Sequence, residues 1–225
     1  MSCCGAYEGF LIPEAAIRFA CTSTTTSIGN HKRGEHMNFK NSFRAVVVGL
    51  AGLVSLPGCG TTYPNRNVVG EPFPTVRGKS LSGEEMTLPD HFKGKKVIIV
   101  VGYVQDTQFD IDRWGIGFFT ANLPLPPIYE VPTIPGLLPS LFKEAIDKGM
   151  RSGIPQESWK DVVTVYGGDG GKIAQWTGTQ TPRNSRIILL DEKGIVLWMH
   201  DKGYGLPPLK SLLDVLARSA ATEGR

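Results

Sequence analysis

The chain has 225 residues, of which 41% are aliphatic, aromatic or cysteine and 20% are charged. This composition is typical of a globular protein and excludes a wholly disordered chain. The net charge of +3 is small for this length, so nucleic acid is not expected as a partner. No apolar run reaches the 18 residues of a membrane-spanning helix.

Residues 37–58 have the layout of a bacterial secretory signal. Lys40 and Arg44 form a positive start, and an uncharged, mostly apolar segment follows at 45–56. This segment has the length of a signal core and is too short to cross a bilayer stably. A lipoprotein signal peptide is therefore predicted.

The signal ends in Leu56-Pro57-Gly58-Cys59, which resembles a lipobox, although Pro57 stands where a small residue is usual. The resemblance implies a diacylglycerol on the Cys59 thiol, cleavage before Cys59, and acyl chains such as palmitate. We expect a periplasm-facing lipid anchor in the cell envelope. The outer membrane is favoured because Gly60, rather than Asp, follows the cysteine. An ordinary cleaved signal and a buried N-terminal helix remain alternatives.

The position of this signal affects how the rest of the chain is divided. A signal peptide belongs at the start of a protein, so residues 1–36 are interpreted as an upstream extension, with translation beginning at Met37. A genuine N-terminal extension is the alternative. Residues 59–69 are predicted to be a tether and residues 70–218 a folded domain.

The domain shows alternating strand and helix patterns after a lead-in rich in turns at 70–83. The continuous β-branched run Val97–Val101 is typical of a strand covered on both faces. Further strands are expected at 128–131, 162–166, 186–190 and 195–199. Helices are expected at 106–122, 139–151 and 207–217, with short helical turns at 88–92 and 172–176. In the second helix, four apolar residues are predicted to face inward: Leu141, Phe142, Ala145 and Ile146.

This order predicts an α/β fold, with a mixed central sheet and helices on both faces. Three motifs carry a closer resemblance: Gly70–Pro74 with Leu81–Gly83, Gly94–Val97, and Thr181-Pro182 before the 186–199 hairpin. The domain resembles the thioredoxin-like superfamily, in particular its periplasmic thiol-reductase and peroxiredoxin branch. The resemblance implies a thioredoxin-like three-layer sandwich and a cis-proline at Pro182.

The active-site cysteines of that branch are absent. Asp106 and Phe109 occupy the two positions that the resemblance assigns to them. Thiol–disulfide exchange requires a thiolate, and no cysteine lies between residues 60 and 225. The chain is therefore not expected to be a thiol–disulfide oxidoreductase or a peroxidase.

We expect a binding role instead, as a chaperone, assembly factor or scaffold with a protein partner. Val163–Gly167 and Trp198 add a resemblance to a cysteine-free mitochondrial family that assists ATP synthase assembly. Two alternatives remain open for the cleft around Asp106 and Pro182: an enzyme that uses Asp106 as acid or base, and a carrier of a small ligand.

Other polar residues give weaker indications. Asp106, Asp110 and Asp112 are interpreted as complementing and capping a helix N-terminus, rather than as a cation site. The two histidines of the domain, His91 and His200, make a poor zinc site without cysteines, so no metal or cofactor is expected. The glycines at 167–171 predict a turn. The proline-rich segment 124–139 is either a partner surface or an insertion that packs over the sheet.

Overall fold

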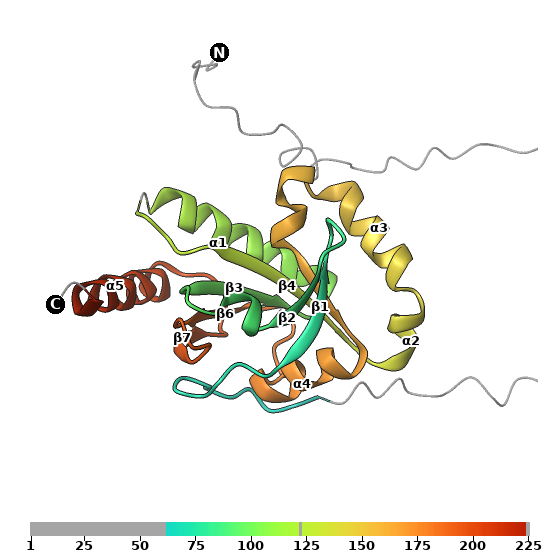
Figure 1. The fold of residues 1–225 in the computed structure, drawn as a ribbon, viewed down its shortest axis with the longest axis horizontal. Coiled ribbons are helices and arrows are strands. Elements are labelled where there is room, and N and C mark those ends of the chain that lie inside the picture. Colours follow the sequence, from blue (N-terminus) through green and yellow to red (C-terminus); the bar gives the residue numbers. More distant parts are fainter. Residues whose placement is uncertain (1–61, 122, 224–225) are drawn as a thin grey trace, which may run out of the picture. The chain divides into compact units, whose positions relative to one another are not determined.

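The computed structural model describes residues 62–121 and 123–223, which form a mixed seven-stranded sheet (Figure 1). The strand order is β2-β1-β5-β4-β3-β6-β7. The central strand β4 pairs in parallel with β3 and β5, and the other pairings are antiparallel. The strands are β1 (Val76–Ser80), β2 (Glu85–Leu88), β3 (Val97–Gly102), β4 (Ile128–Pro135), β5 (Val163–Tyr166), β6 (Arg186–Leu190) and β7 (Val196–His200).

Helices cover both faces of this sheet. The α-helices are α1 (Gln108–Thr120), α2 (Leu137–Leu141), α3 (Lys143–Gly153), α4 (Gly167–Thr177) and α5 (Leu206–Glu223). Three 3₁₀ turns lie between these elements: η3 (Asp90–Phe92) before β3, η4 (Gln105–Thr107) before α1, and η5 (Gln156–Asp161) before β5. No helix in the described part of the chain is long and apolar enough to span a membrane.

Strand β3 shows why both faces are buried. Val100 packs with α1 and α5 in one apolar cluster, whereas Val101 packs with α4 in the other. The parallel β3–α1–β4 unit is followed by the antiparallel β6–β7 hairpin and α5. This arrangement is the predicted three-layer α/β sandwich, with a mixed sheet.

The predicted helix 139–151 is wrong in detail, because α2 ends at Leu141 and α3 begins at Lys143. The buried residue of α3 is Asp147, which accepts a hydrogen bond of 2.7 Å from the Tyr166 hydroxyl. This contact turns the helix so that a polar side chain faces the domain. None of the four residues predicted to face inward is fully buried. Leu141, Phe142 and Ala145 are exposed, and Ile146 is partly buried.

The glycine run 167–171 does not form the predicted turn but opens α4. A Cβ added at Gly170 would lie 2.9 Å from the Val165 carbonyl oxygen and 3.1 Å from the Ile134 carbonyl carbon. The missing side chain therefore lets the helix approach β4 and β5 closely. Glycine lowers helix propensity, and here tertiary packing outweighs that preference.

The proline-rich segment 124–139 also differs from the prediction. Its middle is the central strand β4, which extends beyond the predicted 128–131 to Pro135. The strand is paired on both sides, but only Val131 and Thr133 of it are fully buried, so the segment contributes to both the sheet and the surface.

The segment predicted as a tether is bound to the domain from Tyr63 onward. Thr179 N donates to Tyr63 O at 2.8 Å, and Tyr63 N donates to the Thr179 hydroxyl at 3.0 Å. Arg66 N donates to Thr177 O at 3.1 Å. The Val68 side chain is fully buried in the core. The tether prediction is wrong for these residues, because burial and hydrogen bonding fix them. Met37, Cys59 and the rest of 1–61 lie outside the described residues.

Candidate functional site

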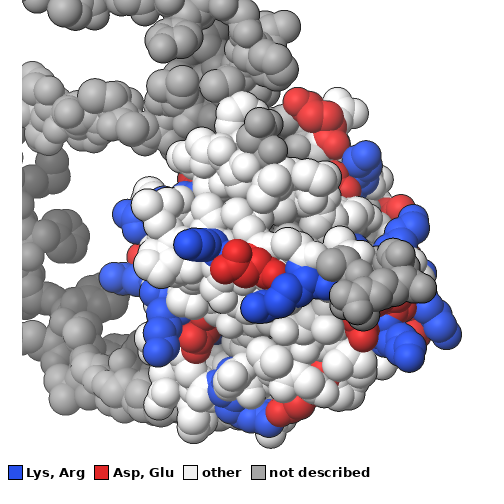
Figure 2. All heavy atoms as spheres, turned by 90° about the vertical axis from the view of Figure 1, so that its left-hand side faces the viewer, with Lys and Arg blue, Asp and Glu red and all other residues white. Residues whose placement is uncertain are grey.

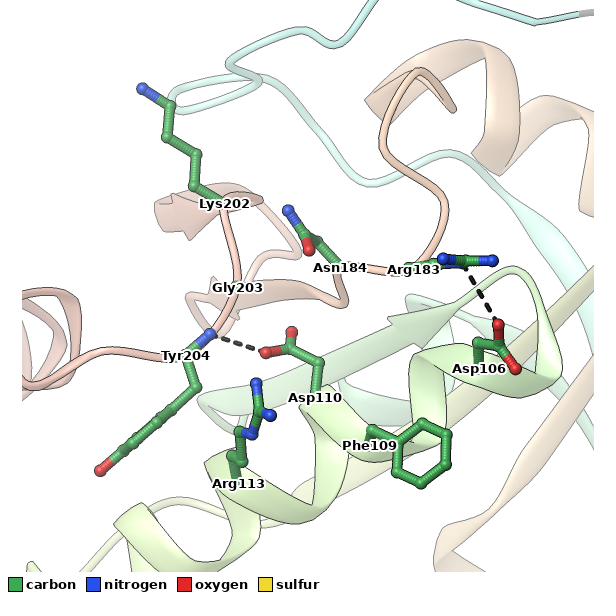
Figure 3. Close-up of a pocket in the computed structure, with 9 residues that line it drawn as sticks. All are labelled: Asp106, Phe109, Asp110, Arg113, Arg183, Asn184, Lys202, Gly203 and Tyr204. Atoms are coloured by element: carbon green, nitrogen blue, oxygen red, sulfur yellow. Dashed lines mark hydrogen bonds and ion pairs between the residues drawn. The ribbon is translucent and has the colours of Figure 1, made fainter.

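Three segments meet at the N-terminus of α1 and surround a shallow pocket of about 460 Å³ (Figure 3). They are η4 with the first turns of α1, the turn before β6, and the loop between β7 and α5. The structure thus brings together the regions of Asp106, Phe109 and Pro182, as the resemblance implied. The lining residues are Asp106, Phe109, Asp110, Arg113, Arg183, Asn184, Lys202, Gly203 and Tyr204.

Asp110 joins these three segments. Its side chain is 6% exposed and accepts three hydrogen bonds, two from the backbone N (2.9 Å) and Oγ (2.6 Å) of Ser185 and one from Tyr204 N (2.7 Å). Its place in the first turn of α1 also suits the positive end of the helix dipole. Because its oxygens are occupied, the carboxylate acts as a structural connection.

The Asp106 side chain is exposed, whereas an acid or base catalyst with a raised pKa would be buried. Its carboxylate lies 3.2 Å from the Arg183 guanidinium, with side chains 54% and 78% exposed respectively. An ion pair in this setting contributes about 0–1 kcal/mol. The enzyme alternative, which requires a buried Asp106, therefore has no support in this geometry.

The three aspartates do not form a cation site. Asp112 is exposed and accepts a hydrogen bond from the Gln108 side chain at 2.9 Å. Within residues 62–121 and 123–223, no group of three or more His, Cys, Asp or Glu side chains could hold a metal. The predicted capping by Asp106 is also wrong, because Thr107 precedes α1 and no side chain caps the helix.

The prediction of a cis-proline at Pro182 is wrong. The one cis peptide bond in the described residues joins Leu88 and Pro89. Pro182 instead occupies the second position of a β-turn that Asn184 N closes on Thr181 O at 3.1 Å. The fixed φ of a trans proline suits that position. The Thr107 hydroxyl donates to Pro182 O at 2.8 Å and holds the turn against η4.

The Arg186 side chain holds the same turn by hydrogen bonds to its backbone. Its fully buried guanidinium donates to the carbonyl oxygens of Thr181 (2.9 Å), Asn184 (2.6 Å) and Gly178 (3.0 Å) and to the Asn65 side chain (3.1 Å). It also lies over the Tyr103 ring, 5.3 Å from the centroid. Burial lowers the pKa of Arg186 and raises that of the Tyr103 hydroxyl to about 12. Sequence reasoning missed Arg186, although a charged residue beginning an apolar strand was a usable signal.

Exposed apolar side chains continue from the pocket along α1. Phe109 is 71% exposed, and its ring projects from the first turn of the helix (Figure 3). Ile116 and Phe119 are exposed on the same helix. Positions 109, 116 and 119 fall roughly along one side of a helix, so these residues form an apolar stripe beside the pocket.

The neighbouring face at the α5 end carries a mixture of charges. In Figure 2, Lys and Arg side chains lie next to Asp and Glu side chains, and uncharged surface surrounds these groups. On the described part of this face, no broad patch of one charge appears.

The chain has distant structural neighbours among solved proteins. No protein-family model matches the chain, and no curated protein matches its sequence. A thiol peroxidase from Chromobacterium violaceum is 12% identical, with a TM-score of 0.45 over 72% of this chain and 92% of that one. Copper-bound yeast Sco1 is 15% identical, with a TM-score of 0.47 over 70% and 95%. The exposed lipoprotein thioredoxin Etrx1 of Streptococcus pneumoniae is 16% identical, with a TM-score of 0.42 over 63% and 98%. At such identities the likeness concerns the fold alone.

Proposed function

We propose that this thioredoxin-like domain is a redox-inactive binding module. It holds an extended segment of a partner protein beside the N-terminus of α1 and serves as an assembly factor, chaperone or scaffold. A lipid on Cys59 anchors it to the cell envelope, on the periplasmic side and preferably at the outer membrane. The observation that carries the proposal is the pairing of exposed Asp106 and Phe109 on a rigidly held frame.

The frame supports binding because its parts are already ordered. Asp110 connects α1 to the loops on either side of the pocket, and Arg186 holds the 181–184 turn through its carbonyl oxygens. A surface that is ordered before binding loses less conformational entropy when a partner docks.

The surface chemistry also suits a peptide segment. Phe109 provides an exposed aromatic anchor, and the Asp106–Arg183 ion pair provides a polar rim beside it. Aromatic and arginine side chains contribute disproportionately to protein–protein binding. The pocket is lined mainly by charged and polar groups, so this site does not favour the small-ligand carrier.

Redox inactivity is tested with the purified protein in an insulin-reduction assay and a peroxide-consumption assay. Rates equal to buffer are expected, because residues 60–225 provide no thiolate. Turnover above buffer, in protein free of contaminating thioredoxin, would refute the proposal.

Binding is tested by placing a photo-crosslinking amino acid at Phe109 in cells. The matched control position is Lys148, an exposed residue of α3. A discrete crosslinked protein is expected from position 109 and not from position 148, and Arg183→Glu should weaken it. Identical products from both positions would contradict a site at α1.

A further inference from the structure

A second pocket, of about 510 Å³, shares no lining residue with the first. It is formed by α1, η5 and the strands β3 and β4. Apolar and aromatic side chains make up most of its lining, including Trp114, Phe118, Phe119, Leu125 and Ile128. A pocket of this size suits a small molecule.

Glu130 is the unexpected residue in this lining. It lies on the central strand of the sheet, paired with Val100 on one side and bridged to Val162 on the other. Within the described residues its carboxylate has no hydrogen bond or ion pair. Burial, with a smaller contribution from Asp112, raises its pKa to about 7. The residue is only partly buried, so its side chain borders the space that a ligand would enter.

The charges around the pocket have one sign. Asp161 of η5 also belongs to the lining. The negative charge of Asp112 on α1 repels that of Glu130. No Lys, Arg or His lines the pocket among the residues that the structure describes. The electrostatic complement of this lining is therefore a positive charge carried on an apolar body.

We infer that this pocket binds a small organic ammonium ion, with its apolar or aromatic group against Phe119 and Leu125 and its charge at Glu130. An ammonium group provides the donors that the carboxylate lacks, and aromatic faces attract a cation by a further interaction. The inference is independent of the proposed function, because the two sites share no lining residue.

Binding is measured by titration calorimetry on the purified chain with 2-phenylethylammonium, and with 2-phenylethanol as the neutral match. At about pH 8 the amine should bind at least about tenfold more tightly than the alcohol, since a charge-assisted hydrogen bond is gained. At about pH 6 the amine should lose about tenfold, because most of Glu130 is then protonated. The amine itself remains charged at both pH values.

Two variants localise the effect. Glu130→Gln keeps the shape of the side chain and should reduce amine binding to the level of the alcohol. Gly115 lines the pocket, and a Cβ there would meet no atom within 4 Å, so Gly115→Leu should fill the pocket and abolish binding of both probes. Asp214→Asn, an exposed carboxylate on α5, is the control and should change nothing.

Equal affinity for amine and alcohol, or amine binding that survives Glu130→Gln, would overturn the inference. Tighter binding of N-acetyl-lysine methylamide than of the aromatic amine would also overturn it, because the ligand would then be a protein side chain. If wild-type protein binds neither probe, the inference is likewise overturned.

Discussion

Two carboxylates, Asp110 of α1 and Glu130 of β4, have opposite environments in the fold. Asp110 accepts three hydrogen bonds and joins segments that are distant in sequence. Glu130 lies on the central strand without a hydrogen bond or ion pair to another described residue, and burial raises its pKa. A carboxylate that is fully hydrogen-bonded serves the structure, whereas one whose charged form is disfavoured by burial carries a cost that a bound cation would relieve. Removing each charge should therefore have effects of opposite sign on stability.

The largest effect is expected for Asp110→Ala. The variant leaves the Ser185 and Tyr204 donors without an acceptor, and each unsatisfied buried group costs about 1–3 kcal/mol. A loss of about 3–5 kcal/mol in the free energy of unfolding should appear in urea denaturation. Asp112→Ala, at an exposed position, should change it by less than about 0.5 kcal/mol. Similar losses in both variants would contradict the structural role of Asp110.

The second effect has the opposite sign. Glu130→Gln should stabilise the protein by roughly 2–3 kcal/mol at about pH 8, since each pKa unit corresponds to about 1.4 kcal/mol. Between its ordinary value of 4.5 and its folded value of about 7, Glu130 holds a proton in the folded state and loses it on unfolding. Wild-type stability therefore falls as pH rises through this window.

Denaturation at several pH values measures this prediction. The difference between variant and wild type should grow from about pH 5 to about pH 8. A difference that does not depend on pH would show that the Glu130 pKa is not raised. An added organic ammonium should restore stability to wild type and not to the variant.

The sequence predicted those parts of the fold that depend on local pattern. The β-branched run of β3, the β6–β7 hairpin, α1 and α5 all have a clear periodicity or turn signal. The glycine-opened α4 and the orientation of α3 could not be predicted, because Gly170 and Asp147 act through contacts with distant strands.

The candidate site was predicted only in part for the same reason. The family resemblance placed Asp106 and Phe109 beside the Pro182 turn, as the structure does. Asp110 meets Ser185 across 75 positions and Arg186 meets Asn65 across 121, and no local pattern reveals such pairs. The cis-proline was predicted from the motif alone, whereas the turn that contains Pro182 accommodates the trans form.

The third prediction concerns the rim of the second pocket. Gly115→Ala should stabilise the protein by about 0.5–1 kcal/mol, because alanine favours a helix over glycine and its Cβ meets open space. Gly117→Ala is the matched control on the same helix. Its Cβ would lie 2.6 Å from the Tyr204 ring, so it should destabilise instead. Thermal unfolding of the two variants distinguishes them, and equal shifts would contradict the packing of Tyr204 against α1.

The smallest effect on stability, but a decisive one for function, is expected for Phe109→Ala. The Phe109 ring is 71% exposed, so its removal should change the free energy of unfolding by less than about 0.5 kcal/mol. Partner capture should nevertheless fall, because an exposed aromatic anchor contributes about 1–2 kcal/mol or more to a protein interface. With a photo-crosslinking amino acid at Lys202, across the pocket, Phe109→Ala should reduce the crosslinked product at unchanged protein level. Leu206→Ala removes an equally exposed apolar side chain from α5 and should leave the product intact. If both variants reduce it alike, the partner recognises general apolar exposure rather than the site at α1.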